Sequence, residues 1–353
     1  MIPRGTLEAI LPNGDPPDLP LDPREVEAIG EDNLLLRIAK WREAIRRAFI
    51  NFIVETPRDS PERMRSLITP ATTVGIGVID VPENESYWTS PTFNRSGQVA
   101  TRDGYTLGVA IYSASVSRNS VEELPVDWLP LPDSPGVAVP IVLHRAEWTR
   151  HHHPSGGRAA AVVSDGPDRY LLTARHVVAK KHIGARVDLF CGNNFSCCHC
   201  SGIVAMKGPL YLDVALIRIQ SMPCQINTSK PVVPRAASLG ATVRHHFGSS
   251  AAALPATITQ AVGLPGTFIN PAAPLTFLTD KVGVKGDSGS AITSDGPRWP
   301  SGSGTCDLIG TYSGQVRIRM PGPTGRTREL GFGHDAFEAM QLFGTMLQEG
   351  VYP

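Results

Sequence analysis

Three short motifs combine the residue types that hydrolysis of an acyl bond requires. His176 lies in Leu-Leu-Thr-Ala-Arg-His-Val-Val, Asp213 opens the apolar run Val-Ala-Leu-Ile, and Ser288 lies in Gly-Asp-Ser-Gly-Ser. A serine hydroxyl is a poor nucleophile until a neutral imidazole accepts its proton, and a buried carboxylate holds that imidazole in one tautomer. Glycines beside the serine let backbone N–H groups point at a developing oxyanion. The three motifs together therefore predict a nucleophilic site for acyl transfer.

The chain order of the three residues narrows the class of hydrolase. Here the order is His, Asp, Ser, whereas subtilisins have Asp, His, Ser and α/β-hydrolases have Ser, acid, His. Taken singly, a histidine at a strand end, an aspartate before a strand and a glycine-rich turn are each more often structural. Their occurrence in one order, each at an expected strand boundary, is much more specific.

Through the motifs Thr-Ala-x-His, Asp-x-Ala-Leu and Gly-Asp-Ser-Gly, residues 137–349 resemble the chymotrypsin/trypsin-like serine peptidases. The resemblance is to the compact bacterial and high-temperature-requirement-like branches in particular. It implies that His176 is the general base and then the general acid, that Asp213 orients it, and that Ser288 is the nucleophile. It also implies an oxyanion hole formed by the backbone N–H groups of Gly286 and Ser288. The implied reaction passes through an acyl-enzyme and needs no cofactor.

The same resemblance assigns a substrate pocket and a strand that pairs with the substrate in antiparallel fashion. The residue six positions before the nucleophile is Val282, so the acidic residue that selects Arg or Lys is absent. The substrate is expected to carry a neutral or apolar side chain before the scissile bond. A preference for an acidic side chain is the alternative, because Lys285 is expected at the rim of the pocket. Gly314 stands where the family has an aromatic residue. The predicted pocket comprises Val282, Val284, Lys285, Tyr312, Ser313 and Gly314.

The elements that must position these residues are mostly short strands. From residue 136 onward, two runs of about six turn-bounded strands precede an amphipathic helix over 335–349. This pattern predicts a mainly β fold of two six-stranded antiparallel β-barrels, chymotrypsin-like, with a C-terminal helix. Residues 137–143 are expected to be the first strand of the first barrel. The run His151-His152-His153 is expected in a solvated loop between the first strands.

Residues 1–135 are expected to form a smaller α+β region that precedes the peptidase-like domain at 136–353. Apolar residues recur at three- and four-residue spacing over 33–54, which predicts a helix with one face in a core. The Pro-rich stretch 125–135 is the best candidate for a linker between the two regions.

The charge balance says nothing about the fold, but it limits the classes of partner that can be expected. Lys and Arg number 33 and Asp and Glu number 33, so no global charge favours nucleic acid or an anionic membrane. Residues 1–135 carry a net charge of −7 and residues 136–353 a net charge of +7, which predicts two regions that rest against each other. No signal-peptide pattern and no run of ~18 apolar residues is seen, so the expected location is cytoplasmic.

Four cysteines and a histidine lie within ten residues, as Cys191, Cys197, Cys198, His199 and Cys200. Thiolates and imidazole at this density could bind a structural Zn²⁺. Their spacing differs from the paired Cys-x-x-Cys of common zinc modules, so free thiols or a disulfide remain alternatives.

The function predicted from the sequence is a serine endopeptidase that acts on protein or peptide substrates, with an N-terminal region that regulates it or binds a regulatory partner. Two alternatives remain open: a catalytically silent scaffold that binds proteins, and an esterase that uses the same triad. No Arg or Lys followed by Ile-Val-Gly-Gly occurs near residue 136, so activation by cleavage at such a sequence is not expected.

Overall fold

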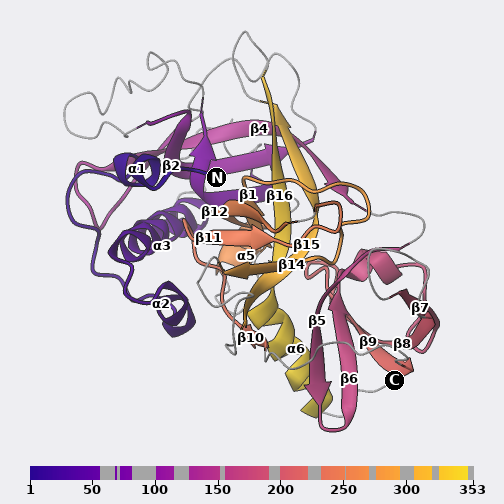
Figure 1. The fold of residues 1–353 in the computed structure, drawn as a ribbon. Helices are drawn as coiled ribbons and strands as arrows, with labels where there is room; N and C mark the ends of the chain where they lie inside the picture. Colours follow the sequence, from indigo (N-terminus) through magenta and orange to yellow (C-terminus); the bar gives the residue numbers. More distant parts are fainter. Residues whose placement is uncertain are drawn as a thin grey trace.

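The computed structural model describes most of the 353-residue chain, and Figure 1 shows its fold. The described residues are 1–55, 68–69, 72–81, 101–114, 127–151, 156–190, 199–221, 232–250, 252–269, 276–294, 306–319 and 326–348. The helices are α1 (Arg4–Ala9), α2 (Pro23–Ile29), α3 (Asn33–Glu55), the 3₁₀ helix η3 (Arg175–Val178), α5 (Pro265–Ile269) and α6 (Ala336–Gln348). The strands up to residue 221 are β1 (Thr73–Asp80), β2 (Tyr105–Ser113), β3 (Asp127–Pro130), β4 (Ala138–Arg150), β5 (Ala159–Asp165), β6 (Asp168–Thr173), β7 (Arg186–Phe190), β8 (His199–Lys207) and β9 (Ala215–Ser221). The remaining strands are β10 (Val232–Pro234), β11 (Thr242–His245), β12 (Leu254–Gly263), β13 (Thr276–Thr279), β14 (Ala291–Ser294), β15 (Cys306–Arg319) and β16 (Thr327–Asp335).

Six antiparallel strands of the larger sheet close into a ring. Their order is β11-β14-β15-β16-β13-β12, and β12 pairs again with β11. Alternation along the strands sends one face of each inward, so the ring encloses its own apolar core. That core contains Val243, Ile258, Phe277, Ile292 and Tyr312. The predicted second barrel of six strands corresponds to this ring.

The larger sheet continues beyond the ring through strands that come from the N-terminal part of the chain. β12 pairs with β1, β1 with β2, and β2 with β4, which runs parallel to it. β4 then pairs with β15, so a second closed circuit shares β12, β13, β16 and β15 with the ring. A separate apolar cluster that includes Ile79, Tyr112, Val142 and Phe332 fills it.

The smaller sheet has five described strands in the order β5-β6-β9-β8-β7, all antiparallel. Its apolar residues pack with α6, and Tyr170, Leu172 and Phe343 belong to one buried cluster. The prediction of a mainly β chain with two β bodies and a C-terminal helix is confirmed. Residues 137–143, expected as a sixth strand of this first body, instead form part of β4 in the larger sheet.

Helix α3 covers the N-terminal strands of the larger sheet, as Figure 1 shows. The Asp32 carboxylate accepts from the backbone N–H of Leu34 at 3.0 Å, which satisfies a donor that a helix start leaves free. Trp41, Ile45 and Phe49 are fully buried in a cluster with residues of β1, β2 and β4. The helix predicted over 33–54 is confirmed.

The expected boundary between residues 135 and 136 lies within one sheet. β1 and β2 precede it in the chain, yet they hydrogen-bond to β12 and β4. The Pro-rich segment was expected to be a linker, but Asp127–Pro130 forms β3 and pairs with β4. Proline is compatible with this position because β3 ends the strand order and so has a free edge.

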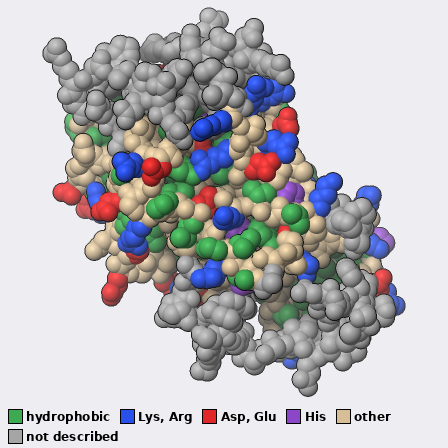
Figure 2. Space-filling view, turned by 45° about the horizontal axis from the view of Figure 1, so that its top comes forward, with side chains coloured by type: hydrophobic (Ala, Val, Ile, Leu, Met, Phe, Trp, Pro, Cys, Tyr) green, Lys and Arg blue, Asp and Glu red, His purple; other side chains and the backbone are tan. Residues whose placement is uncertain are grey.

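Ion pairs join the acidic N-terminal region to the basic remainder. Arg328 pairs with Asp80 and Arg235 with Glu27, while Arg24 of α2 lies 3.4 Å from Glu338 of α6. On the face shown in Figure 2, side chains of both charges are interspersed over the described surface. Opposite charges of the two regions therefore meet in local ion pairs.

Candidate active site

The three motif residues meet between the two β bodies. His176 lies in η3, directly after β6, and Asp213 precedes β9, so both come from the smaller sheet. Ser288 lies in the turn between β13 and β14 of the six-stranded ring. The backbone N–H of Arg175 donates to the Asp213 carbonyl at 3.1 Å, which ties η3 to the start of β9.

The side chains form a continuous hydrogen-bonded relay. His176 Nδ1 is 2.6 Å from Asp213 Oδ2, and His176 Nε2 is 2.8 Å from Ser288 Oγ. Asp213 Oδ1 accepts from the backbone N–H of His176 at 2.9 Å, so the carboxylate holds the histidine at two points. All three side chains are buried. This arrangement can move a proton from the serine hydroxyl to the imidazole.

The surroundings of Asp213 keep its carboxyl ionised. Burial by itself would raise its pKa, but the hydrogen bond and the charge of His176 act in the opposite direction. The nearby charge of Arg150 adds to the effect, so the pKa of Asp213 lies below its ordinary value. An ionised partner stabilises the imidazolium that forms when the histidine accepts a proton.

The turn that carries Ser288 is fixed by internal contacts. Buried Asp287 accepts from the Ser249 hydroxyl at 2.8 Å and from the backbone N–H of Val284 at 2.9 Å. Gly289 has a φ of 89°, a conformation that residues with a side chain rarely adopt. Its N–H donates to the Tyr312 carbonyl at 2.7 Å. These contacts hold the serine against the end of η3.

The groups that would bind a substrate backbone are occupied by another part of the same chain. The Gly286 N–H, one of the predicted oxyanion donors, donates to the carbonyl of His151 at 2.9 Å. The carbonyl of Ser313 accepts from the backbone N–H of His151 at 3.1 Å, and its oxygen lies 3.0 Å from Ser288 Oγ. His151 and Ser288 therefore approach the same Ser313 carbonyl.

The predicted pocket residues divide into two groups. Tyr312, Ser313 and Gly314 are buried next to His151, and the Tyr312 hydroxyl is 3.0 Å from His151 Nδ1. Val284, at 56% exposure, and Lys285 face outward, while Val282 is half-buried. The side chains of Val284 and Lys285 are thus not among the buried groups that surround the His151 imidazole.

His151 and Arg150 are the two residues whose place the sequence did not indicate. His151 is expected in a solvated loop, but its side chain is only 4% exposed, because it directly follows β4, which pairs with β15, and it packs beside Tyr312. Arg150 Nε lies 3.7 Å from Asp213 Oδ2. The local signal was the histidine run itself, and His152 and His153 lie outside the described residues.

The predicted zinc ligands lie mostly outside the described residues. Cys191, Cys197 and Cys198 are in residues 191–198, which the structure does not describe, while His199 and Cys200 begin β8 and pair in register with Phe190 and Leu189. Among the described residues, no group of three or more His, Cys, Asp or Glu is placed to hold a metal. The zinc site stays a prediction.

No helix in the described part of the chain is long and apolar enough to cross a bilayer.

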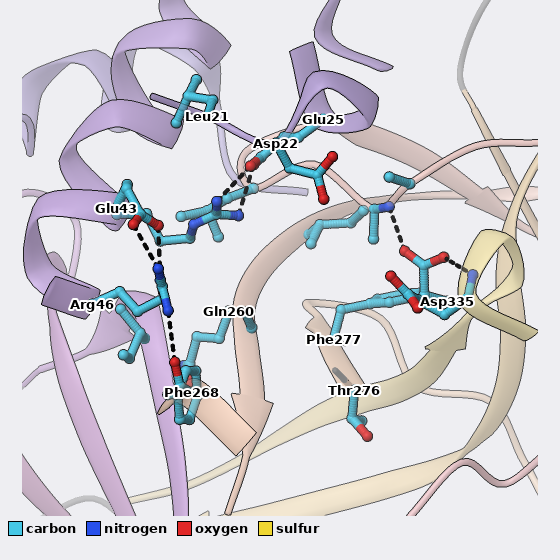
Figure 3. A pocket seen from close by; sticks show the side chains of 18 of the residues that line it. Leu21, Asp22, Glu25, Glu43, Arg46, Gln260, Phe268, Thr276, Phe277 and Asp335 are labelled. Carbon is cyan, nitrogen blue, oxygen red and sulfur yellow. Dashed lines mark hydrogen bonds and ion pairs between the residues drawn. The ribbon is translucent and has the colours of Figure 1, made fainter. Parts of the chain in front are cut away.

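A cavity of about 460 Å³ lies away from the triad, between the N-terminal helices and the larger sheet (Figure 3). Glu43 and Arg46 of α3 line one side, and Phe277 and Asp335 line the other. Arg46 donates to the Phe268 carbonyl at 2.6 Å and to Glu43, so its charge is already satisfied. None of His176, Asp213 and Ser288 lines this cavity.

Comparison with known proteins gives only distant likenesses. No protein-family model matches the chain, and no curated protein matches it. Among solved structures, a Nocardiopsis protease (NAPase) is 18% identical with a TM-score of 0.33, and covers 54% of this chain and 95% of its own. An inactive form of Rv3671c from M. tuberculosis is 18% identical with a TM-score of 0.35. The match covers 56% of this chain and 86% of the Rv3671c chain. The HtrA-type protease AlgW with a decapeptide is 14% identical with a TM-score of 0.33. The match covers 81% of this chain and 66% of the AlgW chain. Superpositions this loose assign neither a family nor an activity to this chain.

Proposed function

We propose that this protein is a serine peptidase that hydrolyses peptide bonds through an acyl-enzyme. The observation that carries the proposal is the buried relay Ser288–His176–Asp213, with contacts of 2.8 and 2.6 Å. Three separate chain segments contribute to this arrangement. The Ser288–His176 contact is short enough for proton transfer, and the His176–Asp213 contact orients the imidazole.

In the proposed reaction His176 accepts the Ser288 hydroxyl proton while the serine oxygen attacks the substrate carbonyl. Asp213 stays ionised and stabilises the imidazolium. The backbone N–H groups of Gly286 and Ser288 would bind the oxyanion, a contribution of about 3 kcal/mol for each donor in comparable sites. His176 then gives its proton to the leaving amine, and water completes the hydrolysis by the same path. No step requires a metal ion.

Peptides are favoured over simple esters because the wall beside Ser288 binds an extended backbone. The end of β4 pairs with β15 in antiparallel register, with Arg150 opposite Gly314 and Thr149 opposite Gln315. A strand edge of this kind recognises main-chain hydrogen-bonding groups, which a small ester does not offer.

We also propose that the region before the cleft regulates the enzyme. Supporting this, β4 holds contacts with β2 and β3 and then enters the cleft. A chain segment anchored in this way competes with any external substrate for the Ser313 carbonyl and the Gly286 N–H.

The proposal is tested with a peptide library whose cleavage is read by mass spectrometry. Because His151 occupies the cleft, the library is offered to the wild type and to His151→Pro, since proline lacks the N–H that bonds to Ser313. Hydrolysis by folded His151→Pro should disappear when Ser288→Ala is added and persist with the matched control Ser290→Ala.

Two results would reject the proposal. A folded His151→Pro chain that cuts no peptide would favour a silent protein-binding scaffold. Turnover of activated esters alone would favour an esterase. Circular dichroism verifies that each variant is folded.

A further inference from the structure

The backbone of His151 makes the two hydrogen bonds expected of the residue on the acyl side of a scissile bond. Its N–H donates to the Ser313 carbonyl at 3.1 Å, and its carbonyl accepts from the Gly286 N–H at 2.9 Å. The second contact places the carbonyl oxygen at a donor predicted to bind the oxyanion. The same Ser313 carbonyl is 3.0 Å from Ser288 Oγ, so the nucleophile and the His151 backbone share one neighbour.

The residues before His151 approach along the strand in the direction a substrate would take. β4 pairs with β15 from Arg145 opposite Arg319 to Arg150 opposite Gly314. Gly314 makes this close approach feasible, because a Cβ there would lie 2.1 Å from the Thr149 carbonyl oxygen. The absence of an aromatic side chain at position 314 thus leaves room for the chain's own backbone.

The side chain of His151 is enclosed as a specificity residue would be. Tyr312 lies with its ring centroid 5.7 Å away, and its hydroxyl reaches His151 Nδ1 while accepting from the Gly283 N–H at 2.8 Å. Burial lowers the pKa of His151, despite opposing contributions from Gln315 and Asp287, which favours the neutral imidazole at this hydroxyl.

The chain also returns to the serine immediately afterwards. Residues 152–156 link His151 to Gly157, and the Arg158 N–H donates to the Ser288 carbonyl at 2.7 Å. Contacts on both sides of this short link are therefore made to the 286–288 turn.

We propose that the chain cleaves its own backbone after His151, with Ser288 as nucleophile. This inference rests on the proposed peptidase function and adds a specific internal substrate to it. Holding reacting groups together within one chain replaces a bimolecular encounter with an intramolecular one and so speeds the reaction.

The step balances as an ordinary hydrolysis. Ser288 Oγ bonds to the His151 carbonyl carbon, and the hydroxyl proton passes to His176. The bond from that carbon to the nitrogen of residue 152 breaks, and His176 protonates the departing amine. Water then attacks the ester, its proton passes through His176 to Ser288, and the products are a His151 carboxylate and a new amino terminus at residue 152.

The fragment that ends at His151 should remain in place after the cut. β4 is hydrogen-bonded to β2, β3 and β15, and none of these pairings depends on the broken bond. The new carboxylate would remain beside the Gly286 N–H, so the cut enzyme is blocked by its own product.

The test uses the full-length chain and its Ser288→Ala variant, compared by intact mass and amino-terminal sequencing under denaturing conditions. We expect the wild type to yield fragments 1–151 and 152–353, which separate only on denaturation, and Ser288→Ala to stay whole. His151→Pro should lose cleavage at this position, whereas exposed His182→Ala, a matched histidine control, should cut as the wild type does.

Mixing experiments distinguish cleavage within one chain from cleavage between chains. Wild-type protein added to tagged Ser288→Ala should leave the tagged chain whole, and the rate of self-cleavage should not change with protein concentration. Cleavage of the tagged chain in proportion to added enzyme would overturn the intramolecular claim.

The inference and the underlying function fail differently. A wild-type chain that stays whole, while folded His151→Pro hydrolyses peptides through Ser288, overturns self-cleavage and leaves the peptidase intact. A wild-type chain that stays whole, with no hydrolysis by either protein, overturns both. A cut at another bond of the 151–153 run would overturn the assignment of His151 as the residue before the cut bond.

Discussion

At the scale of single residues, the proposed chemistry depends on charge as well as position. Asp213 touches His176 at both the ring and the backbone, and its low pKa keeps a negative charge beside the imidazole. Loss of that charge should harm the transition state more than the fold, since an amide can keep the backbone contact.

The change Asp213→Asn is expected to lower kcat by about 10⁴, because the amide N–H₂ stabilises the wrong imidazole tautomer. The measurement is self-cleavage or peptide turnover at fixed pH, with circular dichroism as the control for folding. A loss below tenfold in a folded variant would contradict the role given to Asp213.

His144 supplies a prediction about pH and stability. It is fully buried and stacked on Tyr112, burial lowers its pKa to about 4, and no described residue bonds to either of its ring nitrogens. An unfolded histidine has a pKa of about 6.5, so the unfolded state binds more protons between these values. The free energy of unfolding should therefore rise with pH across this window, and His144 alone should account for a loss of about 2 kcal/mol between pH 7 and pH 5.

Replacing this side chain by His144→Phe should remove that part of the pH dependence and stabilise the protein more at pH 5 than at pH 7. Urea unfolding at both pH values measures it, and the exposed control His182→Ala should leave the slope unchanged. An unaltered pH dependence in His144→Phe would mean that His144 is not held neutral by the fold.

The residues that we propose as catalytic could be singled out from the sequence because each lies in a compact motif. His176, Asp213 and Ser288 meet because local turns place them at strand ends. His151 could not be predicted in the same way, since its position depends on the register of β4 against β15, far along the chain. Local sequence carries little information on such long-range pairings.

At the scale of elements, α3 is the part whose pattern was clearest and whose role is mainly structural. Its buried face packs on the sheet that leads to the cleft, and Ile45 is fully buried there. By contrast, Val54 near its C-terminal end is 54% exposed.

We expect Ile45→Ala to lower the free energy of unfolding by roughly 2–5 kcal/mol, because it opens a cavity in a packed core. The matched control Val54→Ala on the same helix should change it by less than about 0.5 kcal/mol. Urea unfolding followed by tryptophan fluorescence measures both, and equal effects would contradict the packing described for α3.

The strands illustrate where prediction from pattern fails. Residues 137–143 are correctly predicted to form a strand. Their assignment to the first barrel was wrong, because an apolar run does not specify which strands lie beside it. The Pro-rich segment has the composition of a linker, yet β3 pairs with β4 at the edge of the larger sheet. Sheet order, unlike strand position, depends on contacts distant in the chain.

At the scale of the whole molecule, the N-terminal region is part of the sheet that carries Ser288. β1 pairs with β12, and β2 pairs with β4, so removal of residues 1–135 would leave both partners with unpaired edges and an exposed apolar face.

A chain of residues 136–353 alone should therefore be insoluble or lack a cooperative unfolding transition, and co-expression with residues 1–135 should restore both properties. Solubility and thermal unfolding measure this. A soluble 136–353 chain with the thermal transition of the full protein would contradict the shared sheet and favour two independent domains.

The central claim is that Ser288 is a nucleophile activated by His176. The most direct measurement is reaction with a fluorophosphonate, with the modified residue located by peptide mass spectrometry, in the wild type and in His151→Pro. We predict an adduct on Ser288, stronger in His151→Pro because the cleft is open, and none in the double variants that add Ser288→Ala or His176→Ala. A folded His151→Pro protein with no adduct, or with its adduct on another residue, would contradict the claim.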